Sequence, residues 1–185
     1  DYDRFEKVIN SRANSIWYAE HSNEYKFLLA SIRLFRTLEY SIEKGLLTID
    51  YIKNYTDSYY KTDRYYRDAV TNYNAIQNPI YEIEALGERI ELFYDDRYLQ
   101  PLGKEYSTAL RNQENWDFTG VPKLSNFYQM IQRHQFKKLF VIISDGLRYE
   151  IGQEIYDEIR SDVALRGSVS LDYAIIRMGI YDAYV

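Results

Sequence analysis

The sequence predicts an α/β protein with a large helical region, in which a helical N-terminal part precedes the start of a parallel α/β sheet. Apolar residues recur every three or four positions through the first 135 residues or so, as in amphipathic helices. An unbroken apolar run, Leu139 to Ile143, then leads directly into a helix-patterned segment. Such a run is typical of a strand that is buried on both faces. We therefore assign residues 1–135 to a helical region and residues 136–185 to part of an α/β domain.

Composition narrows the class of protein. The 185 residues are 46% hydrophobic and 28% charged, which is ordinary for a globular domain. The net charge of −5 does not predict nucleic-acid binding. The absence of cysteine excludes disulfides and thiolate zinc sites from this sequence, and no apolar run approaches the roughly 20 residues that span a bilayer. We expect a cytoplasmic protein that does not contact a membrane.

Helix boundaries can be proposed along the N-terminal part. Gly45 is a candidate stop signal, Thr48 a candidate cap for the next helix, and Asn78-Pro79 a boundary before another. Pro101 is expected to kink or end that third helix. Each expected helix has one apolar face that should point inward. In the first helix, Tyr25 to Leu38, this face is Leu28, Leu29, Ile32, Phe35 and Leu38. In the second helix it is Tyr51, Ile52, Tyr55, Tyr59, Tyr66, Ala69, Val70, Tyr73 and Ile76, and in the third helix it is Ile80, Ile83, Leu86, Ile90, Phe93 and Tyr94.

The pattern of the C-terminal part predicts one βαβ unit. A short helix over Leu124 to Arg133 precedes a strand over Leu139 to Ser144. The next helix is expected over Arg148 to Arg160, and a second strand over Val163 to Ser170. The inner face of the helix that joins the strands would be Leu147, Ile151, Ile155 and Ile159.

Asp145 is the first candidate for chemistry, because it follows the predicted strand. Ligands of α/β sheets bind at the carboxyl ends of strands, so this carboxylate could hold a metal or face a phosphate. It could instead cap the helix that follows, with Gly146 easing the turn, and the residues alone favour this interpretation. The residues alone leave both interpretations open.

The segment VIISDGLRYE, which ends at Glu150, resembles the opening of the PglZ domain, which occurs in the phosphatase-like protein of BREX phage-defence systems. The stretches Tyr59 to Tyr73 and Ile90 to Leu110 are similar to the helical region that precedes this domain in type A members. The domain belongs to the alkaline phosphatase superfamily. The resemblance therefore implies a metal-dependent phosphoester hydrolase fold, zinc as the cofactor, and Asp145 as a metal ligand.

The same resemblance implies an incomplete catalytic site. The stretch Ser168 to Ile180 is similar to the family's nucleophile segment, and the nucleophile position falls on Ala174, which has no hydroxyl. Ser168 and Ser170 lie nearby, but the match does not place either at that position. The family's histidine ligands come after the aspartate, whereas His21 and His134 both precede Asp145. We expect both histidines to be exposed and without a metal role.

Charged residues near the motifs also allow two interpretations. Arg148 could bind an anionic substrate or form a helix-surface pair, and the latter is favoured. Lys61, Arg64 and Arg67 alternate with tyrosines and could contact a nucleic-acid strand. Helix periodicity, with tyrosines inward and cations outward, explains the same pattern, and neighbouring aspartates dilute the charge.

Two functions remain. The first is a phosphatase-like component of a bacterial phage-defence system, either inactive or truncated in this chain, that works with the other proteins of a defence complex. The alternative is a non-catalytic interaction subunit that uses its helices. The 21 tyrosines suit such helical seams, since a tyrosine buries a large ring and keeps its hydroxyl paired or wet.

Overall fold

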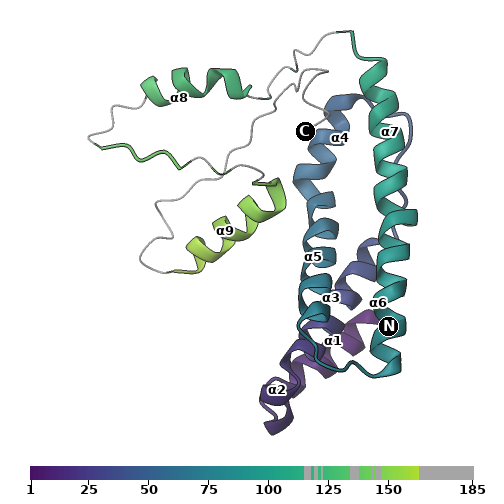
Figure 1. Ribbon diagram of the computed structural model, residues 1–185. Helices are drawn as coiled ribbons and strands as arrows, with labels where there is room; N and C mark the ends of the chain where they lie inside the picture. The colour runs from purple at the N-terminus through teal and green to yellow at the C-terminus, as the bar shows by residue number, and fades with distance from the viewer. Residues whose placement is uncertain are drawn as a thin grey trace. The chain divides into compact units, whose positions relative to one another are not determined.

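The computed structural model describes residues 1–114, 118, 121, 123–133, 138–142, 144 and 147–162, and these residues are largely helical (Figure 1). The chain divides into two units, Asp1–Asn112 and Gln113–Val185, which are treated separately below. The division of the chain at residue 135 stays a prediction.

The first unit is built entirely of helices and their connections. Three helices come first, α1 (Tyr2–Arg12), α2 (Ile16–Glu20) and α3 (Ser22–Thr37). Two long helical rods follow and run side by side in opposite directions (Figure 1). Helices α4 (Thr48–Asn54) and α5 (Tyr60–Asn74) form the first rod, and α6 (Tyr81–Tyr94) and α7 (Gln100–Arg111) form the second.

Each long rod contains one π-helical segment. Segment η1 (Tyr55–Tyr59) joins α4 to α5, and η2 (Asp95–Leu99) joins α6 to α7. Pro101 does not end its helix, because the rod continues to Arg111, and a kink at this residue stays a prediction. Pro101 lies in the first turn of α7, directly after the π segment, where a missing N–H is tolerated.

Helix α3 packs most closely on α5, and its buried face differs from the expected one. The buried residues are Phe27, Ala30, Ser31 and Leu34, together with Leu38 just beyond the helix. Leu28 and Phe35 are only partly buried. The predicted face missed the large side chains of Phe27 and Leu34 as well as the small ones, because apolar residues occur on two adjacent faces of this helix. Ala69 of α5 is buried in the same core. The Ser31 hydroxyl donates a hydrogen bond to the Phe27 carbonyl at 2.6 Å, so this buried hydroxyl has a partner.

Two boundary predictions also need correction. Helix α3 ends at Thr37, eight residues before Gly45, which lies in the connecting loop with φ +71°. Thr48 begins α4 but does not cap it, since its buried hydroxyl has no hydrogen-bond partner. The boundary at Asn78-Pro79 was correct, as α5 ends at Asn74 and α6 begins at Tyr81.

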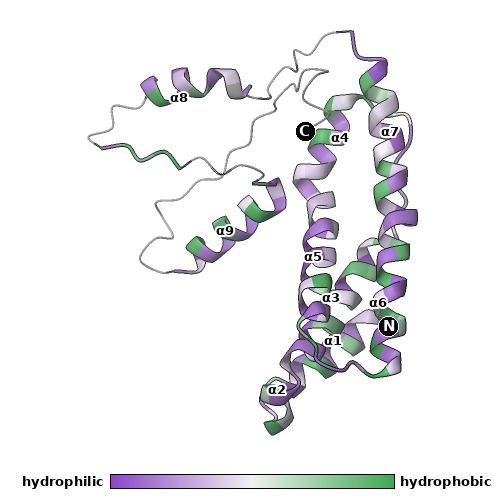
Figure 2. Cartoon of the chain, viewed as in Figure 1, coloured by the Kyte–Doolittle hydropathy of each residue, from purple (hydrophilic) through white to green (hydrophobic). Residues whose placement is uncertain are grey.

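Tyrosine rings fill much of the core of the first unit. Tyr51 and Tyr98 are both buried, and each hydroxyl donates to a backbone carbonyl, of Glu43 at 2.8 Å and of Tyr59 at 3.0 Å. The Tyr51 ring meets the Tyr106 ring edge-on. Hydrophobic and hydrophilic residues alternate along the rods (Figure 2), as expected for helices that bury one face. Tyrosines therefore lie between the helices, as predicted, but Tyr51 and Tyr98 lie in the buried core rather than in shallow seams.

Helix α1 is held to α3 by charge rather than by apolar burial. Arg33 pairs with Glu6 at 2.7 Å and Arg36 with Asp3 at 2.6 Å. No residue of α1 is buried, and Phe5 is exposed. Partly exposed ion pairs contribute little stability, so α1 is held less firmly than the rods.

The second unit confirms two predicted helices. The 3₁₀ turn η3 (Leu124–Asn126) leads into α8 (Phe127–Arg133), and α9 spans Tyr149–Ser161. The expected inner face of α9 is only partly covered, because Leu147 and Ile155 are exposed while Ile151 and Ile159 are half-buried. Glu150, on a different face, is buried.

The predicted first strand is not seen in the described part of this unit. Leu139, Phe140, Val141 and Ile142 have irregular backbone and are 48%, 85%, 47% and 91% exposed. A strand needs neighbours to accept and donate its backbone hydrogen bonds, and the described residues provide none. The predicted second strand, Val163 to Ser170, lies outside the described residues.

No helix in the described ranges has both the length and the apolar character needed to cross a bilayer.

Candidate functional site

The start of α9 carries the described part of the predicted phosphatase-like site. Arg148 precedes the helix in extended conformation, and its Nε lies 3.2 Å from Oε1 of Glu150. The two side chains differ sharply in exposure, 68% for Arg148 and 1% for Glu150. The buried carboxylate is stabilised by the guanidinium and by the positive end of the helix dipole. This pair anchors an exposed arginine within the motif, and a role for Arg148 in substrate binding stays a prediction.

The other residues predicted for this site lie outside the described ranges. They are Asp145, the expected metal ligand; Ala174, at the expected nucleophile position; the nearby Ser168 and Ser170; and His134. Their roles stay predictions.

No cluster of three or more histidine, aspartate or glutamate side chains that could hold a metal occurs among the residues with described positions. His21 is exposed, as expected, and its Nδ1 lies 3.3 Å from Oε1 of Glu24, one turn along α3. The zinc expected from the resemblance therefore has no complete ligand set in the described part of the chain.

A carboxylate between the two rods was missed at the sequence level. Asp63 on α5 accepts a hydrogen bond from Tyr55 at 2.6 Å through Oδ2 and from Tyr94 at 2.8 Å through Oδ1. Tyr94 also stacks on Tyr66, with ring centroids 3.8 Å apart and planes within 4°. At the sequence level Asp63 was only one of the aspartates that dilute a basic patch. Tyr55, eight residues before it on the same rod, was the available signal.

The π segments meet beside this carboxylate. The Tyr98 ring of η2 packs edge-on against Tyr59 of η1, and its hydroxyl bonds the Tyr59 carbonyl. Burial, followed by the negative charge of Asp63, raises the pKa of Tyr98 well above its ordinary value. The buried Tyr98 hydroxyl is therefore neutral at neutral pH and acts as a hydrogen-bond donor that joins the two rods. It does not provide an ionised nucleophile.

The basic and aromatic stretch of α5 follows helix periodicity. Tyr59, Tyr65 and Tyr66 pack against the core, whereas Lys61 is exposed with its Nζ 5.9 Å from the Tyr60 ring centroid. Arg67 lies 3.9 Å from the neighbouring Asp68. The interpretation with tyrosines inward is confirmed.

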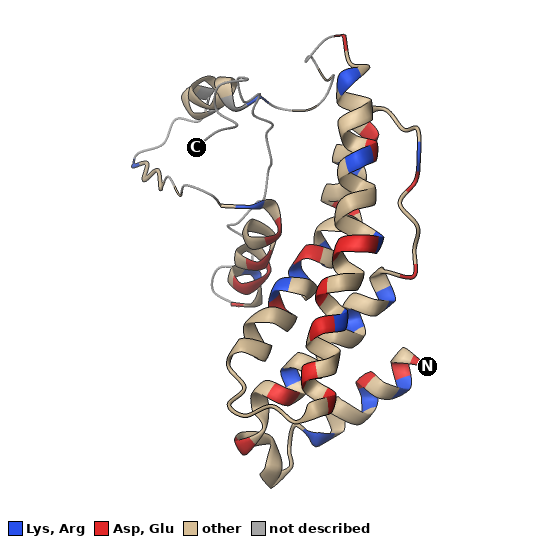
Figure 3. Ribbon diagram, turned by 45° about the vertical axis from the view of Figure 1, so that its right-hand side comes forward, with Lys and Arg blue, Asp and Glu red and all other residues tan. Residues whose placement is uncertain are grey.

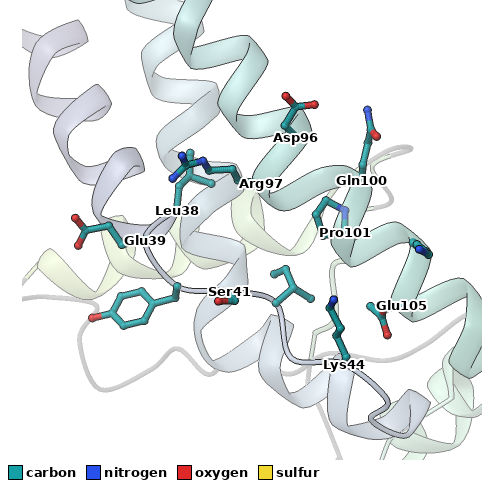
Figure 4. A pocket seen from close by; sticks show the side chains of 12 residues that line it. Leu38, Glu39, Ser41, Lys44, Asp96, Arg97, Gln100, Pro101 and Glu105 are labelled. Atoms are coloured by element: carbon teal, nitrogen blue, oxygen red, sulfur yellow. The ribbon is translucent and has the colours of Figure 1, made fainter.

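A pocket of about 630 Å³ lies between the loop after α3 and the second rod (Figure 4). Leu38, Ile42 and Pro101 provide apolar surface, while Lys44, Arg97 and Glu105 contribute charge of both signs. The backbone N–H of Gly45 donates to Glu105 at 3.3 Å, and the Arg97 guanidinium lies 4.9 Å from the Phe93 ring centroid. This mixed charge pattern does not favour a single class of ligand.

Two curated proteins are similar to this chain over most of its length. The alkaline phosphatase-like protein PglZ of Bacillus cereus (strain H3081.97) is 28% identical over 163 residues, which cover 84% of this chain and 19% of that protein. The alkaline phosphatase-like protein BrxZ of Escherichia coli O9:H4 (strain HS) is 27% identical over 179 residues, which cover 88% of this chain and 20% of that protein.

The chain thus spans about a fifth of the length of these curated relatives. No protein-family model matches the sequence. No solved structure matches it either.

Proposed function

We propose, from the premise that this chain is a homologue of the alkaline phosphatase-like proteins PglZ and BrxZ, that it serves in a phosphatase-like component of a bacterial phage-defence system. The single observation that carries the proposal is this similarity, which extends over 84% and 88% of the chain. The likeness of VIISDGLRYE to the opening of the PglZ domain supports it. In this proposal the protein is cytoplasmic and works with the other proteins of a defence complex.

In this proposal residues 136–185 belong to an alkaline phosphatase-like α/β domain. The run from Leu139 to Ser144 forms a strand when neighbouring strands are supplied from outside the described residues. Its exposed apolar side chains support this assignment, since consecutive Leu, Phe, Val and Ile residues are stable only when both faces are covered. Residues 1–135 form the helical region that precedes the domain.

Metal chemistry would centre on Asp145. A zinc ion held there would polarise a phosphoryl oxygen and activate the attacking group. Arg148 would contribute a guanidinium whose Nε is held by Glu150, which suits contact with an anionic oxygen. Because the nucleophile position falls on Ala174, we propose that this chain does not itself form a phosphoenzyme.

Zinc titration of the whole chain tests the role of Asp145. We expect weak zinc binding that dialysis removes, because tight sites need three or four protein ligands. The Asp145→Asn variant should bind at least several-fold more weakly still. The matched variant Asp57→Asn alters an exposed aspartate of η1 and should bind like the wild type. Equal binding by all three proteins would remove Asp145 as a ligand.

Hydrolysis provides the second readout. The chain should not turn over p-nitrophenyl phosphate above background, since alanine cannot attack phosphorus. Robust turnover that Asp145→Asn abolishes would contradict the assignment of Ala174 to the nucleophile position.

The alternative function, a non-catalytic interaction subunit, draws on a different observation. The first unit keeps large apolar side chains exposed, among them Trp17, Tyr40 and Leu92. Expression of residues 1–135 alone, followed by size-exclusion chromatography and circular dichroism, tests this function. A monomer with a cooperative helical transition and no binding of an apolar dye would remove its support, whereas association would favour it.

A further inference from the structure

A groove along the second rod has one sign of charge. It encloses about 430 Å³. Glu88 and Glu91 of α6 and Asp95 of η2 supply three carboxylates, and no lysine, arginine or histidine lines it. Leu92, Leu99, Tyr66 and Tyr94 complete its surface. We call this surface the acidic groove, and Figure 3 shows acidic positions recurring along the rod that carries it.

The carboxylates of the groove are not neutralised within the described part of the chain. Asp95 accepts a hydrogen bond from the uncharged Gln100 amide at 2.6 Å. Glu88 and Glu91 are exposed and form no ion pair with the described residues. Burial raises the pKa of the Tyr66 hydroxyl, and the negative charges of Glu91 and Asp95 raise it further. The field of the carboxylates therefore extends over the aromatic part of the groove.

The rest of the groove is apolar and well fixed. Leu92 and Leu99 are 57% and 49% exposed, so together they form an exposed apolar surface in the groove. The stacked rings of Tyr66 and Tyr94 lie beside them. The Tyr94 hydroxyl is held by Asp63 on α5, so this aromatic wall is anchored before any partner binds. A preformed apolar surface costs less conformational entropy on binding than a mobile one.

The spacing of the charges matches a helical partner. The three carboxylates recur at intervals of three and four residues, and from Glu88 to Asp95 the helix rises about 10 Å. A partner helix with cations at the same intervals can place one against each carboxylate. Its apolar side chains then fall on Leu92 and Leu99, and one cation can approach the tyrosine rings.

We propose that the acidic groove is the docking site for a basic amphipathic helix of another protein. Charge complementarity selects this occupant, because three carboxylates without a facing cation attract lysine or arginine and repel an acidic partner. The groove lies within the first unit and does not depend on Asp145 or on zinc. Failure of the phosphatase-like assignment would therefore leave this interaction intact, and its own failure would leave the assignment intact.

Fluorescence anisotropy with the whole chain tests the proposal. The probe is a labelled amphipathic helical peptide with lysines on one face and leucines on the other, compared with its glutamate counterpart. We expect the lysine peptide to bind at low salt and to weaken as salt rises, and the glutamate peptide not to bind. The double variant Glu88→Lys/Glu91→Lys should bind the lysine peptide at least tenfold more weakly. Leu92→Ser, which changes no charge, should weaken it several-fold.

The double variant Glu82→Lys/Glu84→Lys is the matched control. It makes the same change in net charge on exposed residues of the same helix, outside the groove. It should retain most of the wild-type affinity. Equal weakening by both double variants would mean general attraction to an acidic protein and would overturn the proposal, as would the absence of peptide binding.

Sedimentation of the unmixed chain distinguishes a second copy as the occupant. Self-association that Glu88→Lys/Glu91→Lys abolishes would replace the basic partner with another molecule of this chain and overturn the proposal. A monomer in both proteins would support it. Circular dichroism checks that every variant retains its helical content.

Discussion

Phe27 and Phe140 are residues of the same type, but the first is buried and the second is exposed. Phe27 lies on α3 with its side chain buried and its ring 5.4 Å from that of Tyr73. Phe140 lies in a run of four consecutive apolar residues that are all exposed. Hydrophobicity alone therefore does not decide burial in this chain.

The two regions differ in whether their backbone N–H and C=O groups can find hydrogen-bond partners within the same segment. A helix pairs its backbone groups within itself, so the rods of the first unit need only bring their side chains together. A strand pairs with other strands, so under the proposed strand assignment the run from Leu139 to Ile142 is buried only when those strands are present. The same apolar content therefore yields a packed core in one region and exposed side chains in the other.

The largest expected effect comes from truncating these two phenylalanines. Phe27→Ala should lower the free energy of unfolding by about 3–5 kcal/mol, because it leaves a cavity in the core. Phe140→Ala should change it by less than about 0.5 kcal/mol, as for other exposed positions. Urea denaturation of the whole chain, followed by helical circular dichroism, measures both. A comparable loss in the two variants would show that Phe140 is buried in solution and would break the comparison.

The next effect sharpens the account of the first unit. Tyr98→Phe should lower the free energy of unfolding by about 0.5–1.5 kcal/mol, because it removes the hydrogen bond that the Tyr98 hydroxyl donates to the Tyr59 carbonyl. Tyr81→Phe, at an exposed tyrosine of α6, should have almost no effect in the same measurement. An equal response of the two variants would mean that water satisfies the Tyr59 carbonyl.

Alkaline pH gives an independent check on Tyr98. Burial and the charge of Asp63 raise its pKa in the folded state, whereas in the unfolded chain it titrates near about 10. The unfolded state therefore loses this proton first, and stability is full below about pH 10 and falls as pH rises further. Tyr98→Phe should reduce that decline by up to about 1.4 kcal/mol per pH unit. An unchanged pH dependence would mean that the other tyrosines account for it.

The smallest expected effect compares two helical glycines. A Cβ on Gly87 would lie 2.9 Å from Cε2 of Tyr73, whereas a Cβ on Gly103 would meet no atom within 4 Å. Gly87→Ala should therefore destabilise by about 1 kcal/mol, because the clash exceeds the gain in helix propensity. Gly103→Ala should stabilise by roughly 0.5–1 kcal/mol. The two shifts in the urea midpoint should have opposite signs, and a gain in both variants would mean that Tyr73 moves aside easily.

Local signals in the sequence located several helices but not their packing. Asn78-Pro79 marked a real boundary, and the predicted helices over Leu124 to Arg133 and Arg148 to Arg160 lie close to α8 and α9. The buried face of α3 was misplaced because apolar residues occur on two adjacent faces of the helix, and periodicity alone does not say which face is buried; Phe27 and Leu34 were missed for this reason. The π segments were also missed, because one extra residue per turn changes the phase of the pattern without a distinctive residue type.

The candidate sites were predictable to different degrees. The motif around Asp145 could be identified from the sequence, and the described residues show one of its residues, Arg148, paired with another, Glu150. The acidic groove and the Asp63 cluster could not be predicted, since each depends on how helices lie beside one another. Tyr94 reaches Asp63 from 31 residues away, a distance over which periodicity carries no information.

The facing π segments also constrain how this fold can change in evolution. Each adds a residue to its rod, and the two are joined through Tyr59 and Tyr98. Loss of one residue from η1 alone would turn the rest of that rod by about 100° and carry Ala69 away from α3. Single-residue insertions and deletions are therefore tolerated poorly here, and homologues of this region should differ by substitution far more often than by length.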